Sequence, residues 1–290
     1  MTVLGQGHTE VCMAIRIVTD SSADLPHDLA DQWNITVVPM NVVVEDVNYK
    51  DGVDIDTDEF YRQLVTNSRL PTTAQPSAAD FQEVYRGLAD QGHSILSIHV
   101  SGKLSGTLNS AEQAKQSLGD AASIEIVDSG LTSITLGLVA LAAAELAESA
   151  QTPKDLGERV RNGLPRYHCF FLLDTLEYLQ KGGRIGKAQA WLGGVLSVKP
   201  ILGLRDGEAL PIARPRSRSR GMRQLLELAQ GMAPVRQLAV IYSTEPQRAE
   251  ELRQALTDLL PGDQIITARF GPALGTYIGP NAVGLALAQA

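Results

Sequence analysis

The chain has 290 residues, a formal net charge of −8, 44% hydrophobic residues and 20% charged residues. This composition is typical of a globular protein with one large or two medium domains. The acidic balance argues against nucleic-acid binding and against general attraction to an anionic membrane. The two cysteines, Cys12 and Cys169, provide neither a disulfide framework nor a zinc-ligand spacing.

Residues 1–13 lack the charged-then-apolar order of a signal peptide, and no apolar run reaches the length of a membrane span. We therefore expect a loose leader over 1–13, ordered structure from Ala14, a cytoplasmic protein and no integral membrane association.

Strand and helix patterns alternate along the first half of the chain, which predicts an α/β fold. In chain order these are strand 15–19, helix 25–33, strand 35–38, hairpin 40–49, helix 57–67, helix 77–90, strand 94–100, a helix from Thr107, strand 123–127, helix 131–150 and helix 152–162.

A shift in composition at 163–165 marks a predicted domain boundary. The elements predicted beyond it are strand 167–173, short helix 175–180, segment 188–197, hairpin 199–214, strand 237–242, a helix ending near Leu260, strand 264–270 and strand 282–288. Gly193 and Gly194 disfavour a helix in segment 188–197, by roughly 1 kcal/mol each. Close approach of another element or of a long ligand would offset that cost.

The loop 101–107, SGKLSGT, follows the predicted strand 94–100 and precedes a helix. Unpaired N–H groups and hydroxyls at such a junction suit an anion. The loop departs from the phosphate-loop pattern, because Leu104 stands where Ser or Thr would contact magnesium. A carboxylate or a lone phosphate remains as ligand. Alternatively, Ser101 and Ser105 only cap the helix.

Two further loops carry hydroxyl groups. Segment 70–77 contains two prolines, which forbid a helix and favour a rigid, exposed, extended loop. A mere connector would not need Thr72 and Thr73, so a binding role stays open for this loop. The acidic, hydroxyl-bearing loops 20–24 and 128–130 both follow predicted strands, at the end where ligands gather in parallel sheets.

The one dense basic segment holds Arg214, Arg216, Arg218, Arg220 and Arg223. It is either a solvated helix face or a contact patch for an acidic partner or a phosphorylated ligand. Aromatic residues do not interleave with the arginines, which argues against single-stranded nucleic acid.

Catalytic signatures are weak. The five histidines lack metal-ligand spacing, and Ser105 is not in a G-x-S-x-G elbow. His99 cannot be assumed to activate the loop serines, because neighbouring strand residues point to opposite faces. A serine-dependent acyl or phosphoryl ester hydrolase or transferase, with Ser105 as nucleophile, remains the alternative function.

Five short motifs together give a resemblance that none gives alone. They are TDSSADL at 19–25, TAQPS at 73–77, LSGT at 104–107, KGGRI at 181–185 and KPI at 199–201. In this order they resemble the DegV family of bacterial fatty-acid-binding proteins, over residues 15 to about 288.

The resemblance implies two α/β domains with the ligand between them. The first, 14–165, would be Rossmann-like with a mostly parallel sheet. The second, 166–290, would be smaller, with a mixed sheet and the pocket for the lipid tail. The ligand would be a long-chain fatty acid in an apolar tunnel, bound without catalysis, metal or cofactor.

The resemblance also assigns residues. Thr73, Ser105 and loop amides would hold the carboxylate, and the remaining predicted site residues are Gly106, Thr107, Arg184 and Tyr277. A separate fatty acid kinase would take the carboxyl group and use its own ATP. Its contact surface would include Arg214, Arg216 and Arg218. Two positions depart from the family pattern, because Ala74 replaces a serine and Tyr277 replaces a histidine.

Overall fold

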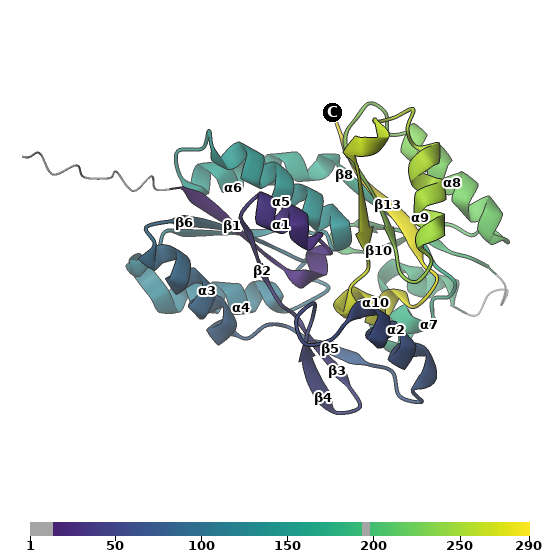
Figure 1. Ribbon diagram of the computed structural model, residues 1–290, viewed down its shortest axis with the longest axis horizontal. Coiled ribbons are helices and arrows are strands. Elements are labelled where there is room, and N and C mark those ends of the chain that lie inside the picture. The colour runs from purple at the N-terminus through teal and green to yellow at the C-terminus, as the bar shows by residue number, and fades with distance from the viewer. Residues whose placement is uncertain (1–13, 193–197) are drawn as a thin grey trace, which may run out of the picture.

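The structure is a computed structural model that describes residues 14–192 and 198–290. The predicted leader and the Gly193–Gly194 pair lie outside the described residues. Three sheets and their covering helices make up the described part (Figure 1). The prediction of an α/β fold with a parallel sheet and a separate mixed sheet is confirmed.

The first sheet is parallel, with strand order β2-β1-β6-β7. Its strands are β1 (Ile15–Asp20), β2 (Ile35–Val38), β6 (Ser94–His99) and β7 (Ile124–Asp128). The central strand β6 is buried almost throughout, in keeping with its apolar residues Ile95, Leu96 and Ile98. Because β1 and β6 run side by side in the same direction, the loops that follow them meet at one edge.

The second sheet is mixed, in the order β10-β9-β8-β13-β11-β12. Its strands are β8 (Tyr167–Leu172), β9 (Ile201–Arg205), β10 (Glu208–Ala213), β11 (Val235–Tyr242), β12 (Ile265–Arg269) and β13 (Val283–Gln289). Only the pair β11 and β12 is parallel. The last strand, β13, lies in the middle of the sheet, so the C-terminal segment completes its core.

Helices cover the sheets in layers (Figure 1). They are α3 (Ala78–Asp90) and α4 (Thr107–Leu118) on one face of the parallel sheet, α1 (His27–Gln32), α5 (Ser133–Ala147) and α6 (Pro153–Gly163) on the other, and α8 (Arg218–Gln230) and α9 (Pro246–Ala255) on the mixed sheet. Helix α5 contacts strands of both sheets. Burial from both sides explains why α5 is apolar around most of its circumference.

A small third sheet has the order β4-β3-β5, with β3 (Asn41–Val44), β4 (Val47–Lys50) and β5 (Thr72–Ala74). The predicted hairpin is confirmed, with Glu45 and Asp46 at φ 49° and 66° in its turn. Segment 70–77 was expected to be only a loop, but Thr72–Ala74 pairs with β3. The flanking prolines favour an extended backbone, and an extended segment of this kind can pair at the edge of a sheet.

Three short elements complete the fold. Helix α2 (Thr57–Thr66) and helix α10 (Pro272–Ile278) pack together, and α7 (Glu177–Lys181) packs on α10. The segment after α7 forms a 3-10 helix over Gly186–Trp191. Among the described residues, no helix combines the length and hydropathy of a membrane span.

Candidate ligand site between the sheets

A cavity of about 380 Å³ lies where loops of the parallel sheet meet the mixed sheet. Its apolar wall comes from both sides and is formed mainly by Leu104, Phe171, Leu173, Leu179, Leu202, Leu204 and Ile278. Its polar lining residues are Ser22, Thr73, Gln75, Ser105, Thr132, Arg184 and Tyr277, and the contacts of Thr73 and Arg184 with Tyr277 define its polar end. An apolar cavity with a few polar groups at one end is the usual form of a site for an amphipathic small molecule.

Strand β5 places Thr73 in the polar end. Its pairing with Val42 of β3 fixes the backbone, and its Oγ1 atom lies 2.5 Å from the hydroxyl oxygen of Tyr277 on α10. One hydroxyl must donate to the other, so one proton of this pair remains available to a ligand.

The loop before α4 contributes Ser105 and Gly106. The Ser105 Oγ lies 2.8 Å from Thr107 Oγ1 and accepts a hydrogen bond from Thr107 N at 3.3 Å. Thr107 is buried, so its contact with Ser105 holds the serine side chain in place. A Cβ added at Gly106 would overlap the Gln75 side-chain amide, so a larger residue here would displace the Gln75 side chain. Ser101, by contrast, donates to the carbonyl oxygen of Gly207 at 2.9 Å and does not line the cavity.

Arg184 brings positive charge to the polar end. Its guanidinium carbon lies 5.2 Å from the centroid of the Tyr277 ring, a cation–π contact. Nε and Nη1 donate to the carbonyl oxygens of Leu104 and Gly182 at 3.2 and 2.8 Å. Backbone carbonyls orient this guanidinium without neutralising it.

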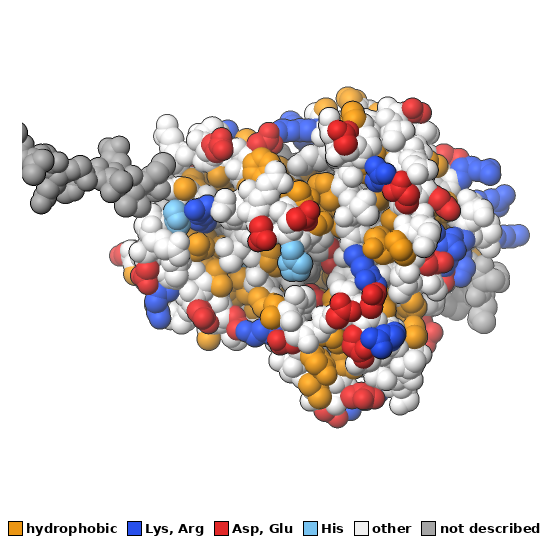
Figure 2. Space-filling view, in the orientation of Figure 1, with side chains coloured by type: hydrophobic (Ala, Val, Ile, Leu, Met, Phe, Trp, Pro, Cys, Tyr) orange, Lys and Arg blue, Asp and Glu red, His pale blue; other side chains and the backbone are white. Residues whose placement is uncertain are grey.

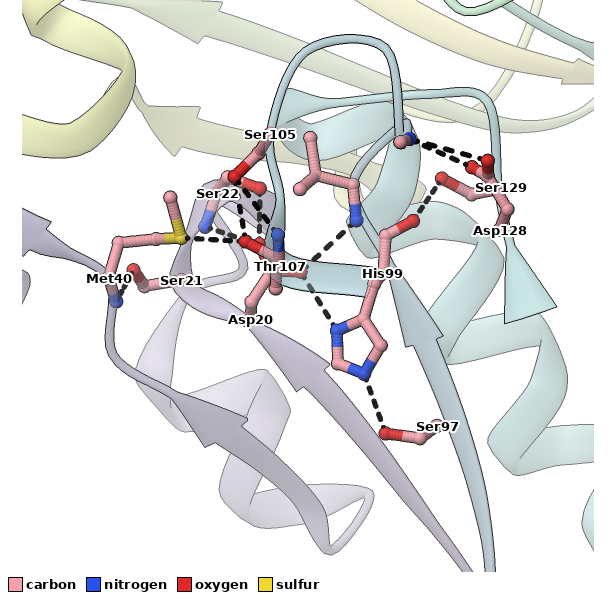
Figure 3. A network of polar contacts seen from close by, with 12 residues as sticks. Asp20, Ser21, Ser22, Met40, Ser97, His99, Ser105, Thr107, Asp128 and Ser129 are labelled. Carbon is pink, nitrogen blue, oxygen red and sulfur yellow. Dashed lines mark hydrogen bonds and ion pairs between the residues drawn. The ribbon is translucent and has the colours of Figure 1, made fainter. Parts of the chain in front are cut away.

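Behind the polar end lies a buried network that sequence reasoning missed (Figure 3). The Asp20 carboxylate and the His99 ring are 0% exposed, and Nδ1 of His99 lies 3.0 Å from Asp20 Oδ2. The Ser22 hydroxyl donates to Asp20 Oδ1, and Ser22 itself lines the cavity. The sequence did point to the acidic, hydroxyl-bearing loop directly after β1. It gave no sign that Asp20 of this loop contacts His99, which is 79 residues away.

The basic segment divides into internal and external arginines. Arg218 pairs with Asp174 and with Glu245, whose Oε2 lies 2.5 Å from its Nη1. The Arg214 guanidinium lies 4.1 Å from the centroid of the Trp191 ring. Arg216, Arg220 and Arg223 are exposed, and Figure 2 shows basic side chains gathered at the edge where Figure 1 places α8.

The surroundings of Ser105 give no support to a nucleophile. Its side chain contacts Thr107, whereas the His99 ring contacts Asp20 and Ser97. Burial raises the pKa of Cys169 to about 12, so this thiol stays protonated. Within the described ranges, no cluster of three His, Cys, Asp or Glu residues has the geometry of a metal site.

Comparison with known proteins agrees with this geometry. The family model described as "Uncharacterised protein, DegV family COG1307" matches residues 14–290. A DegV domain-containing protein of Streptomyces coelicolor is 36% identical over 280 residues, which cover 95% of this chain and 98% of that protein. Protein DegV of Bacillus subtilis is 32% identical, over 94% of this chain and 98% of that protein.

Solved structures show the same fold. A fatty-acid-binding DegV family protein of Thermus thermophilus superposes with a TM-score of 0.88 at 32% identity, covering 96% of this chain and 100% of that chain. A stearic acid-binding protein of Eubacterium ventriosum superposes with a TM-score of 0.86 at 26% identity, covering 94% and 97%. The chain belongs to the DegV family, and the resemblance found in its sequence motifs is confirmed.

Proposed function

We propose that this protein binds a long-chain fatty acid in the cavity between the sheets, with the acyl tail against the apolar wall and the head group at the polar end. The single observation that carries the proposal is this division of one cavity into an apolar wall and an end with hydroxyls and a guanidinium. The fatty-acid-binding names of the structural relatives support it.

The tail and the head group of the acid contribute differently to the binding free energy. Each buried methylene contributes about 0.8 kcal/mol, so a long acyl chain provides most of the gross binding free energy before ordering costs. A hydrogen bond to the head group contributes about 0.5–1.5 kcal/mol if the acid is protonated and about 1.5–3 kcal/mol if it is ionised. The tail thus gives affinity, while Thr73, Ser105 and the loop amides fix the direction in which the acid lies.

We propose further that the protein binds the acid without converting it. Among the described residues, the side-chain contact of Ser105 is with the Thr107 hydroxyl and not with a base, which favours this role over the alternative hydrolase or transferase. A separate fatty acid kinase, recruited through exposed arginines such as Arg214 and Arg216, would then act on the carboxyl group. Arg218 is engaged with Asp174 and Glu245, so it would support that surface rather than form it.

Delipidated protein titrated with hexadecanoic acid tests the binding proposal. We expect saturable binding of one acid per chain, and no turnover of acyl or phosphoryl esters. A protein that does not bind the acid, or that hydrolyses esters with an activity that is lost in Ser105→Ala, would contradict the proposal.

A second experiment tests the kinase contact. Reversal of Arg216 and Arg220 to Glu should abolish capture of the kinase, while Arg62→Glu on the distant helix α2 serves as the matched control.

A further inference from the structure

The Asp20 carboxylate behind the polar end accepts four hydrogen bonds. Two reach Oδ1, from the backbone N of Ser22 at 3.2 Å and from the Ser22 hydroxyl. Two reach Oδ2, from His99 Nδ1 at 3.0 Å and Val100 N at 3.1 Å. These contacts occupy both oxygens of the carboxylate, so the protein itself satisfies Asp20 on each side.

Further polar contacts connect Asp20 to the side chains of His99, Ser97 and Tyr85. Tyr85 donates to Ser97 Oγ at 2.8 Å, and that oxygen lies 2.7 Å from His99 Nε2. Ser97 Oγ thus links Tyr85 to the His99 ring, whose other nitrogen, Nδ1, contacts Asp20. The chain of contacts from Tyr85 through Ser97 and His99 ends on the Asp20 carboxylate, which also accepts from the Ser22 hydroxyl.

Ser22 consequently differs from the other hydroxyls of the polar end. Its proton is committed to the buried Asp20 carboxyl group. Thr107, by contrast, donates to the thioether of Met40 at 3.4 Å, a weak acceptor, so the Ser105–Thr107 pair can reorient when a ligand binds. Ser22 therefore presents only lone pairs to the cavity.

We propose that Ser22 is a hydrogen-bond acceptor for the head group, so that the cavity selects acyl ligands whose head carries a donor: a protonated carboxylic acid, a primary amide or an alcohol. This inference rests on the proposed function and narrows its ligand class. A protonated acid has one acceptor and one donor oxygen, which match the donors Thr73, Tyr277 and Arg184 on one hand and Ser22 on the other.

Other charged groups act on this site from the surrounding elements. Those that face the Asp20 network or the cavity are His99, Asp24, Asp51, Tyr85 and Arg184. Arg184 favours an ionised head group, whereas Asp20, one hydrogen bond behind Ser22, disfavours it. The direct hydrogen bond to Ser22 acts at contact distance, so we expect it to decide in favour of the protonated acid.

The test is the ionisation of the bound acid itself. Hexadecanoic acid labelled with carbon-13 at its carboxyl is bound to the protein, and its carboxyl resonance is followed between about pH 5 and pH 9. We expect the titration midpoint of the bound acid to lie about one pH unit lower in Ser22→Ala than in the wild type. Ser21→Ala is the matched control, because Ser21 bonds to Asp51 and Met40 and does not line the cavity.

A second measurement covers the case in which the midpoint falls outside this range. Ser22→Ala should weaken binding of hexadecanamide about tenfold and leave binding of hexadecanesulfonate, which has no proton to donate, unchanged. Equal titration midpoints in wild type and Ser22→Ala, or equal losses of affinity for hexadecanamide and hexadecanesulfonate, would overturn the role of Ser22. The proposal that the protein binds a fatty acid would be unaffected by either result. Failure of the wild type to bind any of the three compounds would overturn the proposed function as well.

Discussion

The hydroxyl oxygens of Thr73 and Tyr277 lie 2.5 Å apart and join the edge strand of the small sheet to helix α10. The face of the same tyrosine ring supports the Arg184 guanidinium. One side chain therefore aligns two groups of the polar end that come from distant parts of the chain.

The two contacts of Tyr277 can be separated by substitution. Tyr277→Phe keeps the ring under Arg184 and removes the hydrogen bond to Thr73, so we expect affinity for hexadecanoic acid to fall about 2- to 10-fold. Tyr277→Ala removes both contacts and should cost more. Calorimetric titration measures both effects, and an affinity of Tyr277→Phe equal to that of Tyr277→Ala would argue against a role for the ring.

Shortening the acyl chain should cost at least as much as removing a polar contact. Dodecanoic acid has four fewer methylenes than hexadecanoic acid, so we expect it to bind about 200-fold more weakly. Ser105→Ala should weaken binding of hexadecanoic acid by about 2- to 10-fold for a protonated head group and by about 10- to 150-fold for an ionised one. Competition with a fluorescent fatty acid measures both. A loss of five powers of ten in Ser105→Ala, or equal binding of the two acids, would refute a tail-dominated site.

Arg218 should matter for stability, unlike its exposed neighbours. Arg218→Ala leaves the partly buried carboxylates of Asp174 and Glu245 without this cation, so we expect the free energy of unfolding to fall by about 1–3 kcal/mol. Arg220→Ala, on the same helix and exposed, should change it by less than about 0.5 kcal/mol. Urea unfolding of both variants checks this, and equal stability of the two would contradict the internal role.

The pH dependence of stability should report on Asp51. Burial raises its pKa to about 6, although hydrogen bonds from Ser21 and from the backbone of Ala273 oppose the shift. The folded protein therefore binds this proton more tightly than the unfolded chain, and stability is lost as pH rises from about 4 to about 6.

Asp51→Asn removes that loss, because asparagine does not ionise. Relative to the wild type, we expect the variant to gain up to about 3 kcal/mol of unfolding free energy between pH 4 and pH 7. Urea unfolding at the two pH values provides the comparison. A difference between variant and wild type that is the same at both pH values would be the contrary result.

Local patterns were sufficient for much of the fold. The apolar runs at 15–19 and 94–100 and the hairpin turn at Glu45 and Asp46 predicted their elements, because strand burial and turn geometry are set by neighbouring residues. Strand β5 was not predicted, because three residues between two prolines become a strand only through pairing with β3.

The candidate site divides in the same way. Short motifs pointed to Thr73, Ser105, Gly106 and Arg184, and the departure from the family pattern pointed to Tyr277. All five line one cavity, and Thr107 contacts Ser105. The Asp20–His99 contact depends on the register of β1 against β6, and no local pattern encodes it. The internal role of Arg218 likewise depends on acidic residues far away in the chain.

A crystal structure with a hexadecanoic acid that carries bromine at its methyl end tests the central claim most directly. We predict the anomalous bromine peak against the apolar wall, near Phe171 and Leu202, and the carboxyl group beside Thr73 and Ser105. A bromine peak outside this cavity, or a carboxyl group at the apolar wall, would contradict the account.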